Sequence, residues 1–172
     1  MSKPGTRFRD LVSDGAIRPL DVVLFRDDDF VSSMIAKEQR STMGIPSKRS
    51  VYSHIGIVVD RTVLPNVTEM RHGELYVWES TVSGRLLGKG VPNIYGGAHL
   101  GVQVRHLDTL VQAYDEKPDT FLGWAPLLPH FRRWVDEHIY DVQVHMGVLF
   151  HNLNGSFYKL HPWTLLRSNG SR

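Results

Sequence analysis

Short apolar runs rich in β-branched and aromatic residues recur along this chain and predict a sheet of about five short strands. The first run follows a turn at Pro19 and ends at Phe25. The others cover residues 51–59, 74–81, 102–104 and 121–124. Few of these runs are separated by a full crossover helix, which parallel neighbours would need. The pattern therefore predicts an antiparallel sheet.

Apolar residues at helical spacing predict helices between and beyond the strands. A short first helix begins near Phe8 and stops near Gly15. The acidic run at residues 27–29 precedes a second helical pattern, and we interpret it as a helix start rather than a metal site. Asp108 is expected to cap a third helix. We expect the helices to pack on one side of the sheet, which makes the fold class α+β.

The last third of the chain is less regular than the rest. Pro129 is expected to open a helix, because proline is favoured in the first turn. The side chains expected to face inward from this helix are Phe131, Trp134, Val135 and Ile139. Residues 142–153 are apolar without a clean period, and Asn154-Gly155 is a turn signal.

Composition places the chain among globular proteins and gives no sign of a nucleic-acid partner. The chain has 172 residues, of which 41% are hydrophobic and 22% charged, so we expect one domain over residues 1–172. The formal net charge of +2 is too small to indicate nucleic-acid binding. The segment with the densest basic residues lacks interleaved aromatic side chains, and we interpret it as a solvated loop. Its basic residues are Lys37, Arg40, Lys48 and Arg49.

The chain contains no cysteine. A disulfide framework, a thiolate metal site and a thiol nucleophile within this sequence are therefore excluded. The first 14 residues contain no apolar segment of the kind found in secretory signals, and no apolar run approaches the ~20 residues that span a bilayer. We expect a protein without a membrane span in a reducing, intracellular compartment.

Two of the predicted strands each carry one ionisable side chain in an otherwise apolar row. Side chains alternate between the two faces of a strand, so His54 shares a face with Gly56, and Glu79 shares one with Val77. If the two strands pair, the carboxylate and the imidazole meet across the sheet. The carboxylate would then orient the imidazole and fix its tautomer, as a catalytic base requires. Gly56 would leave room on that face for a backbone or a substrate.

A structural interpretation of the same two residues is also open. A single histidine at the end of a strand is often a satisfied core or edge residue, and one glutamate in a strand is often an edge charge. The pattern alone does not decide between the two interpretations.

Three segments, taken in order, resemble a known superfamily. They are Leu-Asp-Val-Val-Leu-Phe at residues 20–25, Ser-His-Ile-Gly-Ile-Val-Val at 53–59 and Tyr-Val-Trp-Glu-Ser-Thr at 76–81. This order resembles the circularly permuted papain-like branch of the NlpC/P60 superfamily, which has members in bacteria, poxviruses and other large DNA viruses. The Glu79 context, followed by residues 101–105, is most similar to the large-DNA-virus members. The resemblance covers residues 17–141, although Leu20 stands where the family usually has glycine.

The resemblance implies a permuted papain-like fold and a thiol amidase, peptidase or acyl-ester hydrolase, with an acyl or peptide substrate and no cofactor or metal. His54 matches the catalytic histidine, which would activate the thiol. Glu79 matches the polar third member that orients the ring. Tyr140-Asp141 is similar to the Tyr-Asp pair that precedes the nucleophile segment of the family.

The family's cysteine has no counterpart in this sequence. One explanation is a chain that stops before the nucleophile segment. The other is a segment that has diverged, which would make the domain an inactive relative of the enzymes. Ser156 is the one stand-in for the nucleophile, but a serine is harder to ionise than a cysteine and would need an oxyanion hole.

Other residues are weaker candidates for chemistry. Histidines in the last third of the chain have spacings that fit neither a helical pair nor a closed four-ligand zinc site. They are His130, His138, His145, His151 and His161. We expect no metal and no cofactor. The tryptophans at positions 124, 134 and 163 are interpreted as core aromatics.

Three functional hypotheses follow. The first is a permuted papain-like hydrolase domain with His54 as base, Glu79 as orienter and no nucleophile of its own. The second is a non-catalytic descendant used in an assembly with protein neighbours, such as a minor capsid-type component of a large DNA virus particle. The third is a binding module whose cleft holds an acyl or peptide group without cleaving it. An exposed apolar patch near Phe150 or Trp163 would favour the second hypothesis.

Overall fold

The computed structural model describes residues 7–26, 33, 37–38, 40–42, 44, 52–81, 91–96, 101–116 and 120–156. The helices with described bounds are α1 (Phe8–Ser13), α4 (Leu107–Asp115), α5 (Pro129–Glu137) and α6 (Ile139–Ser156). The strands are β1 (Val22–Arg26), β2 (His54–Val59), β3 (Tyr76–Thr81), β4 (Gly101–His106) and β5 (Phe121–Ala125).

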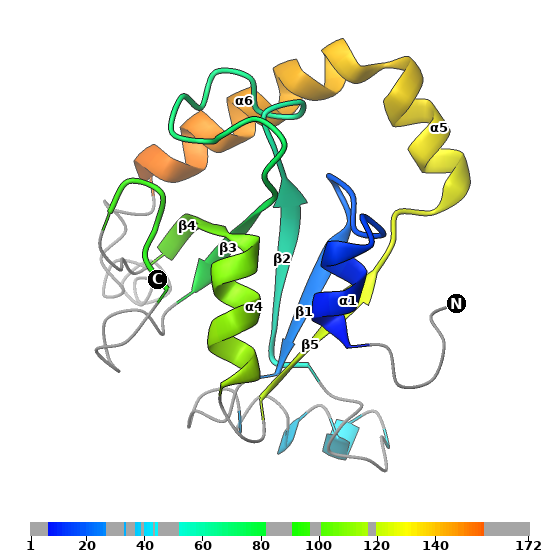
Figure 1. Ribbon diagram of the computed structural model, residues 1–172, viewed down its shortest axis with the longest axis vertical. Coiled ribbons are helices and arrows are strands. Elements are labelled where there is room, and N and C mark those ends of the chain that lie inside the picture. The colour runs from blue at the N-terminus through cyan, green and yellow to red at the C-terminus, as the bar shows by residue number, and fades with distance from the viewer. Residues whose placement is uncertain are drawn as a thin grey trace, which may run out of the picture.

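The five strands form one open antiparallel sheet in the order β4-β3-β2-β1-β5 (Figure 1). The number of strands and their antiparallel pairing confirm the sequence prediction. Gly56 on β2 lies opposite Glu79 on β3, and Phe25 on β1 lies opposite His54 on β2. This register puts His54 and Glu79 on the same face of the sheet.

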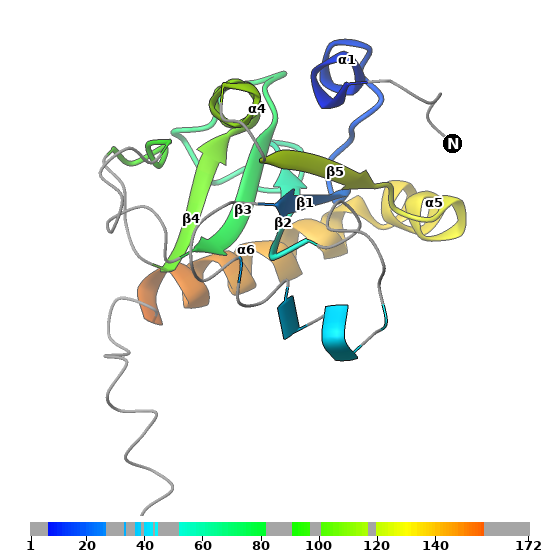
Figure 2. The same cartoon turned by 90° about the horizontal axis from the view of Figure 1, so that it is seen from below.

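One face of the sheet is covered by α1 and α4, which lie together above it in Figure 2. Leu107, Leu110 and Val111 of α4 pack against Val58 and Val77 of the central strands. The apolar side of α1 adds partly buried contacts to this cluster. The site described below lies on the same face.

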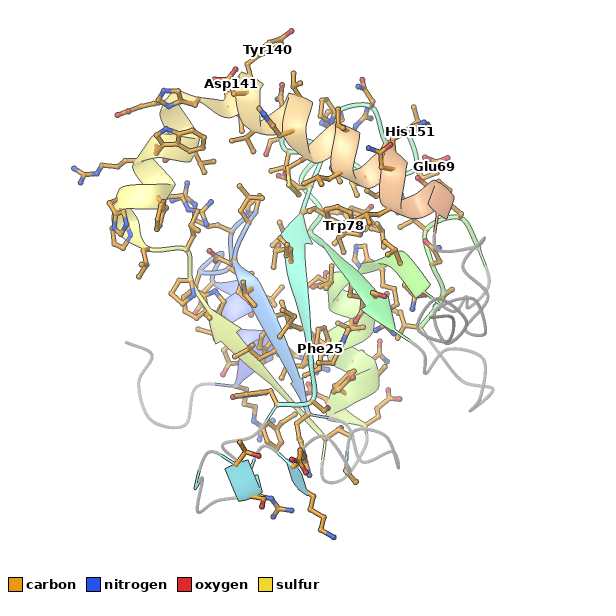
Figure 3. The ribbon with its side chains drawn as sticks, turned by 180° about the vertical axis from the view of Figure 1, so that it is seen from behind. Phe25, Glu69, Trp78, Tyr140, Asp141 and His151 are labelled. Carbon is orange, nitrogen blue, oxygen red and sulfur yellow. The ribbon has the colours of Figure 1, made fainter. Side chains whose placement is uncertain are left out.

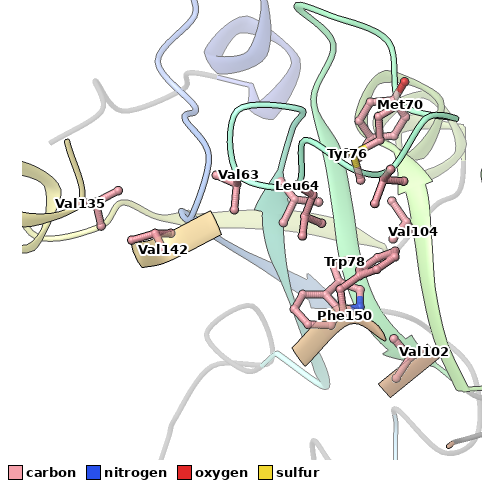
Figure 4. Packing of buried hydrophobic residues seen from close by; sticks show 12 residues of the cluster. Val63, Leu64, Met70, Tyr76, Trp78, Val102, Val104, Val135, Val142 and Phe150 are labelled. Carbon is pink, nitrogen blue, oxygen red and sulfur yellow. The ribbon is translucent and has the colours of Figure 1, made fainter. Parts of the chain in front are cut away.

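The opposite face is covered by α6 and by the loop that follows β2. Phe150 of α6 packs on Trp78 of β3 with ring centroids 5.6 Å apart, and Leu64 of the loop joins this cluster (Figure 4). The loop begins at Asp60, whose carboxylate accepts hydrogen bonds from the backbone N–H groups of residues 62 and 63. These bonds fix the direction in which the chain turns over the sheet.

Helices therefore lie on both faces of the sheet, and the expectation of helices on one side is wrong. Val23 and Phe25 of β1 point to one face and are completely buried. Val22 and Leu24 point to the other and are half-buried. The uninterrupted apolar run of β1 requires cover on both sides, as in strands that are buried in a central layer.

The apolar but irregular segment beyond residue 139 is the 18-residue helix α6, and the turn signal at Asn154-Gly155 lies inside it. Val142 and Phe150 face the sheet and are buried. Val144 and Val148 lie on the outer side and are exposed. Apolar residues on two opposite sides of one helix cancel the 3.6-residue period, which explains why the sequence shows no clean pattern.

Helix α5 turns a different side to the protein than expected. Val135 is buried as predicted, whereas Phe131 and Trp134 are about half exposed and Ile139, at the start of α6, is 37% exposed. The Trp134 ring stacks on His138 at a centroid distance of 4.8 Å instead of entering the core. Only one of the apolar positions of α5 therefore contributes to the core.

The carboxylate of Asp21 connects the start of the sheet with its last strand and with α5. It accepts hydrogen bonds from Trp124 Nε1 at 2.9 Å, from the Leu127 N–H at 2.8 Å and from Arg132 Nη2 at 2.6 Å. The Asp21 side chain is 2% exposed. Its neighbour Leu20 has φ 71°, in the left-handed region that favours glycine.

Two local expectations are corrected. Helix α4 begins at Leu107 with His106 as the N-cap, so Asp108 lies in the first turn and is not the cap. Lys37 and Arg40, which were expected in a loop, have helical conformation. Several other expectations concern residues outside the described ranges: the helix start at 27–29, the basic residues Lys48 and Arg49, and positions 161 and 163. Among the helices that are described, none has both the length and the apolar character needed to cross a membrane.

Candidate functional site

His54 and Glu79 contact each other directly across β2 and β3. His54 Nε2 lies 2.5 Å from Glu79 Oε2, within hydrogen-bond distance. The Glu79 side chain is fully buried, and 27% of the His54 side chain is exposed. The imidazole therefore contacts a buried carboxylate on one side and is accessible to solvent on the other.

The second oxygen of Glu79 is held by Arg105 of β4. Arg105 donates from Nε to Glu79 Oε1, and its Nη2 forms an ion pair with the same oxygen. The Arg105 side chain is 7% exposed. A buried carboxylate is tolerated when it is both paired and hydrogen-bonded, and here each oxygen has its own donor.

Sequence reasoning missed Arg105, although the alternation of β4 contains the signal. Gln103 and Arg105 share one face of β4, and Gln103 lies opposite Glu79 in the register. Arg105 therefore points to the same face as Glu79, one step along the strand. Arg105 follows directly after the strand predicted at residues 102–104, and an arginine buried in a sheet indicates an acidic partner, because arginine is rarely buried alone.

Gly56 and Phe25 shape the space around the pair. A Cβ atom on Gly56 would lie 2.5 Å from Val77 Cγ1 and 3.2 Å from Glu79 Cβ, so only glycine fits. The space that was expected beside Gly56 is thus occupied by these side chains and by Phe25. The Phe25 ring lies 5.1 Å from the His54 ring between centroids and restricts the rotamers that the imidazole can adopt.

This arrangement defines the chemistry that the imidazole can perform. Arg105 donates to Glu79 Oε1, which leaves Oε2 as the acceptor for the imidazole, so Nε2 of a neutral His54 must carry the ring proton. Nδ1 then holds the free lone pair, and it has no hydrogen-bond partner in the described part of the chain. A base of this kind can accept a proton from a thiol, a hydroxyl or a water molecule.

Ser156 and Tyr140-Asp141 lie on a different element. They are at the two ends of α6, the helix that packs against the face opposite to His54 (Figure 2). Tyr140 is 74% exposed. The structure brings His54 and Glu79 together but places the backbone of Ser156 on the other side of the sheet.

A second histidine–glutamate pair lies at the far end of β4 and was not predicted. His106 Nε2 is 3.1 Å from Glu74 Oε2. The hydrogen bond from the Tyr76 hydroxyl lowers the pKa of the Glu74 carboxyl, and the positive charges of His106 and Arg71 act in the same direction. Glu74 is 31% exposed in its side chain, so this pair resembles a surface contact more than the buried site at Glu79.

Gln103 is a further polar residue that sequence reasoning missed. It is 1% exposed, and neither atom of its amide has a hydrogen-bond partner within the described residues. Its position opposite Glu79 adds a polar group to the buried side of the site. For metals, the described residues contain no group of three or more histidines, cysteines or acids that could hold an ion.

Comparison with known proteins adds no relative: the chain matches no protein-family model, no curated protein and no solved structure.

Proposed function

We propose that this chain is a permuted papain-like domain of the NlpC/P60 type whose His54, Glu79 and Arg105 form the base side of a thiol acyl-hydrolase site. The carrying observation is the contact of His54 Nε2 with a fully buried Glu79 that Arg105 also binds. The order of the three strand motifs supports the same family. The nucleophile of such a site is a thiol that these 172 residues do not contain.

The reaction would proceed by acyl transfer. His54 Nδ1 accepts the thiol proton, and the sulfur lone pair forms a bond to the acyl carbon of an ester or amide. The bond from that carbon to the leaving oxygen or nitrogen then breaks, and the imidazolium returns its proton to the leaving group. Glu79 keeps the ring oriented and stabilises the imidazolium, while Arg105 holds the Glu79 carboxylate in place.

The proposal is tested by supplying the missing thiol from solution. The purified chain is mixed with p-nitrophenyl acetate and increasing 2-mercaptoethanol, and p-nitrophenol release is measured. A general base accelerates a reaction about 10²–10⁴-fold when the nucleophile is held in position beside it. A thiol that diffuses in from solution is not held in position, so the acceleration is smaller. We therefore expect the chain to release p-nitrophenol roughly tenfold faster than the same thiol concentration alone. His54→Ala should remove this acceleration, and Glu79→Gln should reduce it.

His106→Ala is the matched control, because His106 is a partly buried strand histidine bonded to a glutamate outside the site. Its rate should equal that of the original chain. Equal rates for His54→Ala and the original chain would reject His54 as a base. Loss of the acceleration in His106→Ala but not in His54→Ala would identify His106 as the reactive histidine.

The second candidate function is a non-catalytic component of an assembly, of the minor capsid type that the resemblance to large-DNA-virus proteins suggests. The observation that favours it is the apolar surface of α5 and α6. Its exposed residues are Leu128, Phe131, Trp134, Tyr140, Val144, Val148 and Leu149. Surfaces of this kind indicate protein contacts. This candidate would be favoured if the rate of p-nitrophenol release did not depend on His54.

A further inference from the structure

Helix α6 has an apolar stripe that faces away from the sheet. Tyr140, Val144 and Val148 are spaced four residues apart, so they lie in one line along the helix. They are 74%, 47% and 55% exposed. Asp141 is the only Asp, Glu, Lys or Arg in this 18-residue helix. A helix that is apolar on both sides is normally covered on both sides.

A pocket of about 630 Å³ runs beside this stripe, between α6 and the loop around residues 64–69. Val67, Val148 and Phe150 form part of its apolar wall, and the exposed side chains of Glu69 and His151 also line it. Tyr95 is another lining residue. Burial raises the pKa of Tyr95, and the negative charge of Glu69, which lines the same pocket, acts in the same direction.

The two ends of α6 are complementary. Tyr140 and Asp141 lie at its beginning, whereas His151 lies towards its other end beside Glu69 (Figure 3). At 1.5 Å per residue, Tyr140 and His151 are separated by about 16 Å along the helix. One end therefore offers a protruding phenol and a carboxylate, and the other offers a pocket and an imidazole.

A two-fold axis brings these ends together. If the axis passes at the height of Met146, Val144 of one copy meets Val148 of the other, and Asp141 meets His151. The two-fold axis is perpendicular to both α6 helices. The side of α6 that carries the pocket therefore points in the same direction along this axis in both copies. Tyr140 of one copy then reaches the pocket of the other at the height of His151, where Glu69 can accept a hydrogen bond from its hydroxyl group.

We infer that the outer face of α6 is an interface between two copies of this chain, which pack with their α6 helices antiparallel. The Tyr140 ring of each copy enters the α6–loop pocket of the other, and Asp141 pairs with His151 at both ends. A second copy is favoured over a different partner because this one face carries both halves of each contact: the carboxylate of Asp141 and the imidazole of His151, and the Tyr140 ring and the pocket. Gly147 lines this pocket, and no atom lies within 4 Å of its Cβ position, so the pocket is open at that point.

The test is the oligomeric state of the complete chain, measured by sedimentation velocity from low micromolar to several hundred micromolar concentration. We expect a dimer that dissociates on dilution. Val148→Glu should give a monomer throughout, because it places a carboxylate in the centre of the apolar contact. Leu149→Glu is the matched control: Leu149 is 49% exposed on the same helix but lies outside the stripe, so the dimer should persist.

A charge exchange tests the register of the two helices. His151→Asp places two carboxylates opposite each other and should raise the dissociation constant about tenfold. The double variant Asp141→His/His151→Asp restores the pairing of a carboxylate with an imidazole and should restore the dimer. Circular dichroism melting of each variant confirms that it is folded.

Three results would overturn the inference. The first is a chain that stays monomeric at every concentration. The second is a dimer that Val148→Glu leaves intact, which would place the interface elsewhere. The third is a double variant as weak as His151→Asp alone, which would reject the antiparallel register.

Discussion

Glu79 is a carboxylate with no contact to water, and its two oxygens are assigned to different partners. One oxygen serves His54 and the other serves Arg105. A glutamine at this position has only one acceptor oxygen, and its NH₂ group would face a donor. The position therefore requires an acid, and the acid requires the arginine.

Replacing Arg105 with methionine should strongly destabilise the fold. The change keeps the side-chain volume but leaves the Glu79 charge buried without its cation, which costs about 3–5 kcal/mol in free energy of unfolding. Urea denaturation measures this loss. Arg71→Met is the control: Arg71 pairs with Glu74 while its side chain is 81% exposed, so about 0–1 kcal/mol is expected. Equal losses for the two variants would contradict the importance of the buried pair.

Leu20 provides a second prediction, because its φ of 71° is unfavourable for any residue with a Cβ atom. Leu20→Ala loses packing and keeps the strain, whereas Leu20→Gly loses the same packing and removes the strain. The glycine variant should therefore be the more stable of the two by about 1 kcal/mol.

Leu122, which is partly buried in β5, is the control for this order. At an ordinary strand position glycine should be less stable than alanine by about 0.5–1 kcal/mol. Thermal melting of the four variants measures both differences. The same order at both positions would show that the Leu20 conformation carries no strain.

The amino-acid sequence predicted the His54–Glu79 contact because strand alternation is a local property. His54 shares its face with Gly56 and Glu79 shares its face with Val77, and only one pairing of the strands was needed to bring the two ionisable residues together. Arg105 was missed because it lies just beyond the strand predicted at residues 102–104 and because an arginine in such a position also fits a strand edge. Contacts across a third strand depend on the register, which no local pattern gives.

Among the secondary-structure elements, α6 departs most from its sequence signal. Strands β1 to β4 follow from runs with β-branched residues and β5 from its aromatic residues, and Pro129 marks the start of α5. In α6 the apolar residues divide between the sheet and the outer stripe, so no single face stands out. The same division misled the prediction for α5, where Phe131 and Trp134 are exposed although they follow a helical period.

The two neighbouring residues Phe150 and Leu149 test which side of α6 holds the helix to the sheet. Phe150 is 8% exposed and contacts Trp78, so Phe150→Ala should cost about 3–5 kcal/mol in free energy of unfolding. Leu149 is 49% exposed, so Leu149→Ala should cost less than about 1 kcal/mol. Urea denaturation of both variants measures the difference. Similar losses would mean that α6 is held by contacts other than the aromatic pair.

In the complete fold, the His54 site and the outer face of α6 lie on opposite sides of the sheet (Figure 2). Helices α1 and α4 share the face of the site, and α6 covers the other. A substitution in the proposed interface therefore leaves the base and its carboxylate unchanged. The general architecture of strands and helices could be predicted from the sequence, whereas the distribution of helices over two faces depends on long-range packing that periodicity does not encode.

The hydrogen bonds of Asp21 also affect the order in which the chain can fold during its synthesis. Three donors to its carboxylate lie 103, 106 and 111 residues later in the sequence. Synthesis proceeds from the N-terminus, so β1 leaves the ribosome long before these donors exist. Until Arg132 emerges, a nascent chain that closed the sheet would bury a carboxylate lacking most of its partners. The buried hydrogen bonds of Asp21 can therefore be completed only after residue 132 has been synthesised, and until then β1 has an exposed edge on the side where β5 will pair.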